Sequence, residues 1–320
     1  MRVSRKRMRL LFIKPKHIGD TLLLTPTLKA ARAVHPNAEI WVLIREGCEN
    51  ILSGCPDIDH IVVTGSSKIE DVKTILKFRK QNFDYAFELS GSDRGRTFCL
   101  LSGAQTKCTN ETVRLLPRFW SNRFDVKSSF NWEFRHAVEK DYYTVSAALQ
   151  LNEPIPPLVF DPELTKECEF SNLENFAIIH PSTRWKRKRW PVDNWAKLGR
   201  ELLTRFDHLV VSCGPDKDER AQAAHLANIL GTNVHSTNGE IHWNQLAGLM
   251  YKAKIFIGVD TAAMHLSSAC QCPLVAIFCD KNNDPWVCQW TPWKSNHRIA
   301  KAYGDETVSQ VINLVENLTG

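Results

Sequence analysis

The sequence predicts an α/β protein with two domains of the Rossmann type. Short apolar segments typical of buried strands alternate with longer segments of helical periodicity. This alternation occurs twice, in residues 10–89 and 176–318, and the two series are separated by residues 152–158, which contain three prolines. The 320 residues suffice for two domains of about 150 residues each. We therefore expect two Rossmann-like domains, residues 1–155 and 156–320, that face each other across a cleft.

The first series predicts a parallel sheet with helices on both faces. Pro26 lies inside the first helical pattern, so we expect a kink there or a helix that begins there. Residues 102–131 show weak periodicity and receive no assignment. The expected strands are residues 10–14, 39–44, 60–63 and 85–89, and the expected helices are residues 27–34 and 69–80.

The second series has the same character. Asp193 is the expected N-cap of its first helix. No strand is followed by G-x-G-x-x-G, which disfavours a dinucleotide-dependent dehydrogenase. The expected strands are residues 176–180, 209–213, 255–259 and 274–278, and the expected helices are residues 193–206, 217–230, 243–251, 261–269 and 308–318.

The charge of the chain is moderately positive and partly clustered. Lys and Arg number 41 against 35 Asp and Glu, a formal net charge of +6, and basic residues gather at 2–9 and 184–189. Such clusters suit phosphate groups or an anionic membrane surface, although a basic run is also common on an ordinary solvated face. No segment reaches the ~20 apolar residues of a membrane span, and no signal-peptide core follows the basic start. We expect a cytoplasmic protein.

The ten cysteines predict reduced thiols rather than a disulfide framework. They form one cluster in sequence, which lacks the C-x-x-C pairs of a structural zinc site. Cys279 ends an apolar strand, so packing in the core is the favoured interpretation and no metal site is expected. The cluster consists of Cys270, Cys272, Cys279 and Cys288.

A carboxylate follows the first predicted strand. Asp20 stands between that strand and a helix-prone stretch, at the edge of the sheet where open α/β folds bind their ligands. Its residue type and position suit either a helix cap or a general base, and one residue can do both.

Two loops of the second series are candidates for holding a nucleoside diphosphate. Residues 180–191 carry Ser182, Thr183 and a basic run that includes Lys188. Hydroxyl and cationic groups donate charge-assisted hydrogen bonds to phosphates, and the position between a strand and a helix favours phosphate over a nucleic-acid or membrane patch.

The second loop, residues 258–265, leads directly from a strand into a helix. If Asp260 caps that helix, the backbone N–H groups of residues 261–263 form an anion site, with His265 one turn further on. The alternative is that Asp260 only caps and His265 packs against the sheet. A third loop, residues 280–286, follows the next strand and is a weaker candidate for contact with a sugar.

Three motifs, in this order, resemble a known family. They resemble glycosyltransferase family nine, the ADP-heptose:lipopolysaccharide heptosyltransferases, and within it the heptosyltransferase III branch. The motifs are Lys14-x-x-His17-x-Gly19-Asp20-x-Leu-Leu, Gly214-Pro-Asp-Lys-Asp218 and Phe256-Ile-Gly-Val-Asp260-Thr261-Ala262-x-x-His265.

The resemblance implies a GT-B fold and an inverting transfer that needs no metal ion or cofactor. The N-terminal domain would bind a lipid-linked core oligosaccharide acceptor, and the C-terminal domain would bind ADP-heptose. By matching motif, Asp20 is implied as the general base and Lys188 as the residue that stabilises departing ADP. The implied donor-binding residues are Ser182, Thr183, Asp260, Thr261, Ala262 and His265, and the implied acceptor-binding residues are Lys14, His17 and Gly19.

The resemblance also bears on partners. A lipid-linked acceptor implies peripheral contact with the inner membrane, for which the basic residues 2–9 with Trp120 and Trp132 are the candidates; no nucleic acid is expected. Residues 279–285 are longer than the matching Gly-x-Thr-Asp-Pro run of many members. Because that loop is expected to face the transferred sugar, a different nucleotide sugar remains the alternative donor.

Overall fold

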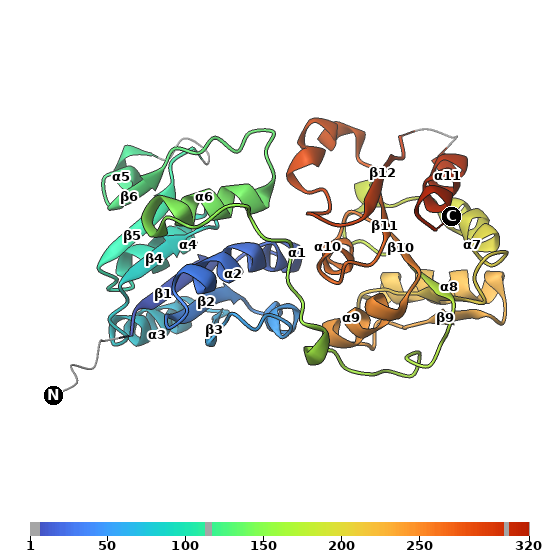
Figure 1. The fold of residues 1–320 in the computed structure, drawn as a ribbon, viewed down its shortest axis with the longest axis horizontal. Helices are drawn as coiled ribbons and strands as arrows, with labels where there is room; N and C mark the ends of the chain where they lie inside the picture. The colour runs from blue at the N-terminus through green and yellow to red at the C-terminus, as the bar shows by residue number, and fades with distance from the viewer. Residues whose placement is uncertain (1–6, 113–116, 304–306, 320) are drawn as a thin grey trace. The chain divides into compact units, whose positions relative to one another are not determined.

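The computed structural model folds into two compact α/β units, residues 1–159 and 160–320 (Figure 1). It describes residues 7–112, 117–303 and 307–319. Each unit is built on a six-stranded sheet whose paired strands are all parallel, with helices between the strands. The predicted α/β class is therefore confirmed.

The sheet of the N-terminal unit has the strand order β3-β2-β1-β4-β5-β6. The central strand β1 is buried along almost its whole length because helices cover both faces of the sheet. Its residues register with β2 from Arg9 opposite Glu39 to Lys14 opposite Ile44. The strands are β1 (Arg9–Lys14), β2 (Glu39–Arg45), β3 (His60–Thr64), β4 (Tyr85–Glu88), β5 (Thr106–Asn110) and β6 (Val126–Ser128).

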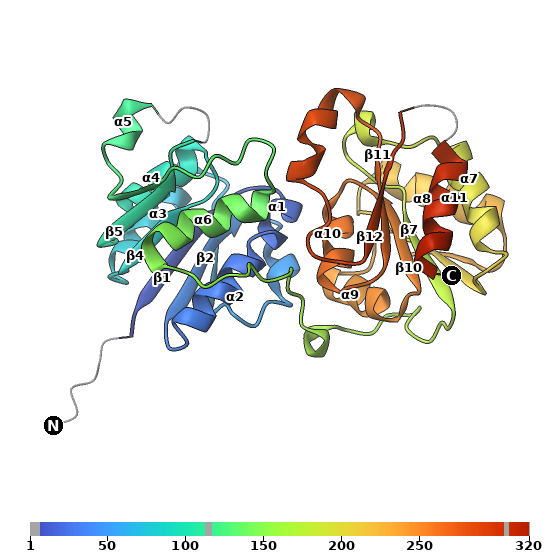
Figure 2. The ribbon, with the colours of Figure 1, turned by 45° about the horizontal axis from the view of Figure 1, so that its top comes forward.

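The helices of this unit form two layers. Helices α2 and α6 lie side by side on one face of the sheet, and α3 and α4 lie on the other (Figures 1 and 2). Pro26 stands in the first turn of α2, so the helix begins there, one of the two outcomes predicted. The helices are α1 (Ile18–Leu22), α2 (Thr25–Val34), α3 (Lys68–Arg79), α4 (Asp93–Leu101), α5 (Arg118–Ser121) and α6 (Ala137–Leu149).

The C-terminal unit repeats this plan with the strand order β12-β11-β10-β7-β8-β9. Helices α7, α8 and α11 pack on one face of its sheet around a core that includes Trp195, Leu226 and Val311. The strands are β7 (Phe176–His180), β8 (His208–Val211), β9 (Val234–Ser236), β10 (Ile255–Val259), β11 (Leu274–Phe278) and β12 (His297–Lys301). The α-helices are α7 (Val192–Leu202), α8 (Lys217–Leu230), α9 (Trp243–Lys252), α10 (Ala262–Ala269) and α11 (Thr307–Thr319), and the 3₁₀ segments include η3 (Lys186–Lys188) and η4 (Lys281–Gln289).

The predicted boundaries of α7, residues 193 and 206, were wrong, because the helix runs from Val192 to Leu202. The N-cap of α7 is Pro191, and Asp193 lies inside the first turn. Proline has a fixed φ and no N–H to leave unsatisfied, so it suits the start of a helix. Asp193 instead interacts favourably with the positive end of the helix dipole.

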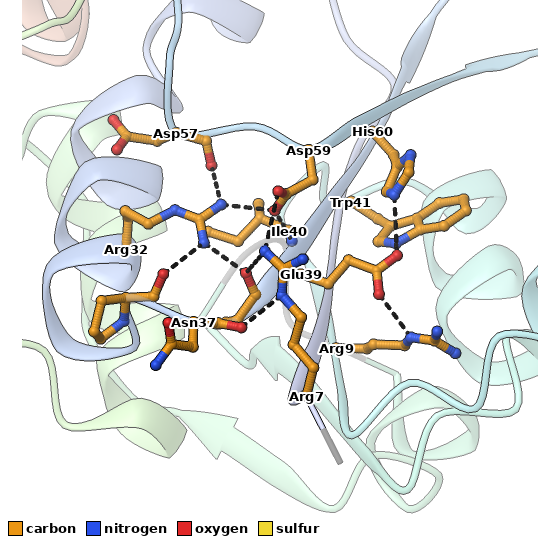
Figure 3. A network of polar contacts seen from close by, with 12 residues as sticks. Arg7, Arg9, Arg32, Asn37, Glu39, Ile40, Trp41, Asp57, Asp59 and His60 are labelled. Carbon is orange, nitrogen blue, oxygen red and sulfur yellow. Dashed lines mark hydrogen bonds and ion pairs between the residues drawn. The ribbon is translucent and has the colours of Figure 1, made fainter. Parts of the chain in front are cut away.

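The first described residues of the basic N-terminal cluster are bound to their own unit (Figure 3). Arg7 pairs with Asp59 (Nη2 to Oδ1, 3.3 Å) and donates to the carbonyl of Asn37 (2.6 Å). Arg9 pairs with Glu39 (Nε to Oε2, 2.8 Å). Both cations therefore already have anionic partners within the N-terminal unit. Arg2, Arg5 and Lys6 lie outside the described residues.

The ten cysteines are free thiols, and most of them are buried. In the described part of the chain, no helix is both long and apolar enough to span a membrane.

Candidate active site

The strand order of each sheet reverses beside its first strand. In the N-terminal unit β1 lies between β2 and β4, and in the C-terminal unit β7 lies between β8 and β10. Open parallel sheets bind their ligands at the carboxyl ends of the strands, at such a switch point. The residues that follow β1, β4, β7 and β10 are therefore the ones expected to contact a ligand.

Asp20 lies at the first of these positions. It stands in the first turn of the short helix α1, half-buried, six residues after the end of β1. The N-cap of α1 is His17, which is exposed, and no side chain caps this helix. Capping was one of the two roles considered for Asp20, and the structure shows that it is not the cap. Gly19 immediately precedes it and is half-buried.

A buried ion pair lies at the end of β1. Lys14 and Asp141, from β1 and α6, have side chains that are 1% and 0% exposed and are paired through Nζ and Oδ2. Lys140 Nζ approaches the other oxygen of Asp141 at 3.3 Å. Burial lowers the pKa of Lys14, opposed chiefly by the charge of Asp141 and to a smaller extent by that of Asp20. The Lys14 ammonium group is thus directed to Asp141, and its field reaches Asp20.

A second buried carboxylate, that of Glu88, lies at the end of β4. Glu88 Oε1 accepts hydrogen bonds from the backbone N–H groups of Ser90 and Gly91, both at 2.9 Å, and from the Ser90 hydroxyl. Burial nevertheless raises the pKa of Glu88. Lys140 Nζ donates to the carbonyl of Leu89 at 3.0 Å. Sequence reasoning did not identify Glu88, although it is the last residue but one of the predicted strand 85–89.

In the C-terminal unit, β7 and β10 bring the two predicted phosphate loops together. His180 pairs in register with Gly258, so Ser182 and Asp260, each two residues further on, leave the sheet side by side. Lys188, at the end of η3, pairs with Asp260 (Nζ to Oδ2, 2.5 Å) and is 21% exposed. The structure thus unites Lys188 and Asp260, which are 72 residues apart.

Two hydroxyl groups beside this ion pair have no hydrogen-bond partner within the described residues. Ser182 Oγ and Thr261 Oγ1 are both shielded from solvent. A buried hydroxyl without a partner is costly, so such groups point to a ligand. Thr183 is buried as well, and its Oγ1 accepts from the backbone N–H of Trp185 at 3.2 Å.

The start of α10 differs from the prediction. Its N-cap is Thr261, and Asp260 caps nothing because its carboxylate is paired with Lys188. Ala262 is the first residue of the helix, and His265 is buried one turn further on. The predicted cap was wrong because a cation from another loop competes for the carboxylate.

The third predicted loop forms η4. Its first flanking residue, Asp280, pairs with Arg187 (Oδ2 to Nε, 2.8 Å), so this loop adjoins the basic run of η3. Asp284 is held by Lys301 and by the Tyr303 hydroxyl, both at 2.8 Å, which lower its pKa.

Another buried group, His180, is the last residue of β7 and the first of the predicted phosphate loop 180–191. His180 Nδ1 is 2.9 Å from the Ser212 hydroxyl, and burial lowers the pKa of His180 to about 4. The imidazole is therefore neutral at physiological pH. Among the described residues, no group of three or more His, Cys, Asp or Glu side chains is arranged to hold a metal ion.

Comparison with known proteins gives a consistent result. Residues 73–314 match the model of glycosyltransferase family 9 (heptosyltransferase). The chain is 25% identical over 291 residues to lipopolysaccharide heptosyltransferase 3 of Escherichia coli, covering 87% of this chain and 84% of that protein. It is also 25% identical over 293 residues to lipopolysaccharide heptosyltransferase 2 of Escherichia coli K12, covering 85% and 82%.

Solved structures agree in fold. A glycosyl transferase family 9 protein from Veillonella parvula superimposes with a TM-score of 0.81 at 17% identity, covering 98% of this chain and 97% of that one. The E. coli heptosyltransferase WaaC with ADP gives 0.79 at 18% identity, covering 97% and 99%. The two α/β units are those of the GT-B heptosyltransferases, as the motifs implied. Since the family model spans most of the sequence, the chain belongs to glycosyltransferase family 9, the heptosyltransferases.

Proposed function

We propose that this chain is an inverting, metal-independent heptosyltransferase that moves a heptose from ADP-heptose to a hydroxyl group of the lipopolysaccharide inner core. Family membership supports heptosyl transfer. The names of the relatives support the acceptor, because they are lipopolysaccharide heptosyltransferases. A structurally similar heptosyltransferase has been solved with ADP-2-deoxy-2-fluoro heptose, which supports the donor.

The observation that carries the donor side is the group of polar atoms at the ends of β7 and β10. Ser182 and Thr261 each present a buried hydroxyl without a partner among the described residues, at the strand ends where Lys188 pairs with Asp260. A pyrophosphate offers these hydroxyls acceptors and offers Lys188 a second anion. Residues 156–320 are accordingly proposed as the nucleotide-sugar domain. Thr183, Asp260, Ala262 and His265 complete the proposed donor pocket.

On the acceptor side, we assign residues 1–155 to acceptor binding and Asp20 to the base. Asp20 takes the proton of the acceptor hydroxyl, the oxygen attacks the anomeric carbon of the donor, and the bond to the diphosphate breaks. Ser182, Thr183 and Lys188 stabilise the charge that develops on departing ADP. No covalent intermediate is required, so a single displacement inverts the anomeric centre.

The acceptor-binding residues proposed from the motif have different roles. His17 is exposed and available to the acceptor. Gly19 has no side chain, so none stands between the acceptor and the backbone next to Asp20. Lys14 is buried and paired with Asp141, so it supports the site through its charge on Asp20 rather than by direct contact.

We further propose that the protein works in the cytoplasm, in peripheral contact with the inner membrane. The lipid anchor of the proposed acceptor supports that contact. The alternative donor, another sugar nucleotide, is kept because η4 replaces the shorter run of many family members at the place expected to face the sugar.

The donor class is tested by thermal shift with ADP, UDP and GDP, because a ligand that binds the folded state raises its stability in proportion to affinity. ADP alone should raise the melting temperature. The sugar is then tested by incubating the protein with ADP-heptose and a core acceptor and identifying the product by mass spectrometry. A shift with UDP or GDP but not with ADP would overturn the donor assignment.

A further inference from the structure

Helix α3 exposes a stripe of large aliphatic side chains. Ile69, Val72 and Leu76 are 70%, 54% and 54% exposed, among the most exposed large apolar residues of the described chain. They are three and four positions apart, so they lie on one face of the helix. The opposite face packs on the core through Phe78, whose ring centroid lies 5.7 Å from that of Phe83. The stripe therefore does not anchor the helix.

Cations flank this stripe on both sides. Successive residues of an α-helix are about 100° apart around its axis. That spacing places Lys68 and Arg79 on one side of the stripe and Lys73, Lys77 and Lys80 on the other, and all five side chains are exposed.

The acidic residues of α3 do not neutralise these cations. Glu70 accepts hydrogen bonds from the backbone N–H groups of Ser66 and Ser67 in the capping box. Asp71 pairs with Arg94 of α4 (Oδ1 to Nη2, 2.7 Å). Both carboxylates are thus engaged at the start of the helix and away from the stripe.

We propose that this face of α3, the stripe with its five flanking cations, is the surface by which the protein docks on an anionic lipid bilayer. Aliphatic side chains enter the boundary between headgroups and acyl chains, while flanking Lys and Arg pair with lipid phosphates. A second copy of this chain is disfavoured as the occupant, because a symmetric contact would bring the same cations together.

The place of α3 in the sheet fits this occupant. All strands of the N-terminal sheet are parallel, so the start of α3 after β3 and the start of α1 after β1 lie at the same edge. Asp20 is in α1. The preference for a membrane over a protein partner rests on the proposed function, since a lipid-anchored acceptor must reach Asp20 from a bilayer.

Flotation with vesicles tests the proposal on the full chain. Vesicles of phosphatidylcholine alone are compared with vesicles of phosphatidylcholine and phosphatidylglycerol at about three to one. The wild type should float with the anionic vesicles. V72S/L76S should bind at least roughly tenfold more weakly because apolar contact area is lost. K73E/K80E should bind at least roughly thirtyfold more weakly.

Matched controls come from the C-terminal unit. Ile229 of α8 is an aliphatic residue that is 39% exposed, and Lys197 of α7 is exposed. I229S and K197E should float like the wild type. Thermal melts should show that all variants are folded, since every altered side chain is on the surface.

Transfer to a water-soluble acceptor fragment, measured in the same variants, separates the two proposals. Unchanged transfer with weakened flotation supports the α3 surface. A wild type that stays unbound, or α3 variants that float as well as it does, overturns that surface. A wild type that floats but transfers no heptose overturns the proposed function and leaves the docking surface supported.

Discussion

Replacing Asp141 by Asn should destabilise the N-terminal unit strongly. The change removes the carboxylate that pairs with the ammonium group of Lys14, whose side chain is 1% exposed. The second cation beside that carboxylate, Lys140, loses the same partner. Removing one partner of a buried ion pair typically costs about 3–5 kcal/mol. The cost has an upper limit, because Lys14 can instead lose its proton. Deprotonating an amine with the ordinary pKa of 10.5 at about pH 7 costs about 5 kcal/mol.

The pH dependence distinguishes this mechanism from a simple packing defect. In the folded variant we expect Lys14 to be neutral, because burial already lowers its pKa and the carboxylate that opposes this is gone; in the unfolded chain it binds a proton up to its ordinary pKa of 10.5. The unfolded state therefore binds more protons, and the free energy of unfolding of the variant rises with pH by about 1.4 kcal/mol per pH unit. Between about pH 7 and about pH 9 the destabilisation should shrink by about 2–3 kcal/mol.

Urea unfolding of wild type and variant at the two pH values measures this difference, and hydrogen exchange of the peptide that covers β1 assigns it to the N-terminal unit. Asp125→Asn is the matched control. Its ion pair with Lys107 is 3.7 Å long with the carboxylate side chain 51% exposed, so its loss should cost at most about 1 kcal/mol. A loss below about 1 kcal/mol for Asp141→Asn, or a loss independent of pH, would refute the reasoning.

Three further predictions concern the proposed reaction and the C-terminal unit. Asp20→Ala should lower turnover about 10²–10⁴-fold while ADP still shifts the melting temperature as in the wild type; full activity would remove Asp20 as the base. Lys188→Met should weaken ADP binding about 10–100-fold in titration calorimetry and slow turnover, and unchanged affinity and rate would exclude it from the site. His180 has a folded pKa of about 4 against 6.5 when unfolded, so the unfolded state takes up the proton first as pH falls. The free energy of unfolding should therefore fall by up to about 3 kcal/mol between about pH 7 and about pH 4, and equal pH slopes in wild type and His180→Gln would contradict this.

Most of the strands that the sequence predicted are buried on both faces; the exception is β3, an edge strand that was predicted although His60 and Ile61 are exposed. Strand β11, with all five residues buried, is a continuous apolar run that needs no knowledge of its neighbours. Strand β12 lies at the edge of its sheet and has only two apolar residues, Ile299 and Ala300, between polar or charged ones, and β9 has only three residues. Neither was predicted, because their structure depends on pairing with the rest of the sheet.

Helix α6 was missed for a related reason. Lys140 and Asp141 lie on its buried side, where they interrupt the apolar periodicity that signals a helix. Their burial is compensated by Lys14 of β1 and by the carbonyl of Leu89, the residue after β4, both of which are far away in the sequence. A single sequence carries no sign of such long-range compensation.

For the candidate site, the residues could be predicted but their pairing could not. Lys188 and Asp260 belong to separate loops, and each has an ordinary local role available, in a basic run and as a helix cap. Only the strand order, which sets β7 next to β10, brings the two together. The hydroxyls of Ser182 and Thr261, which have no hydrogen-bond partner among the described residues, belong to the loops that follow these two strands, so their proximity could not be predicted either.

The ion pair between Lys188 and Asp260 means that, in the proposed reaction, ADP-heptose binds to a lysine that already has a partner. An incoming pyrophosphate competes for the ammonium group of Lys188 with the carboxylate that already pairs with it, so part of the attraction is offset on arrival. When ADP leaves, the same carboxylate takes the ammonium group back, and the lysine is never left unpaired in a half-buried place. A site built in this way holds its nucleotide less tightly than its charges suggest, and it empties more readily for the next turnover.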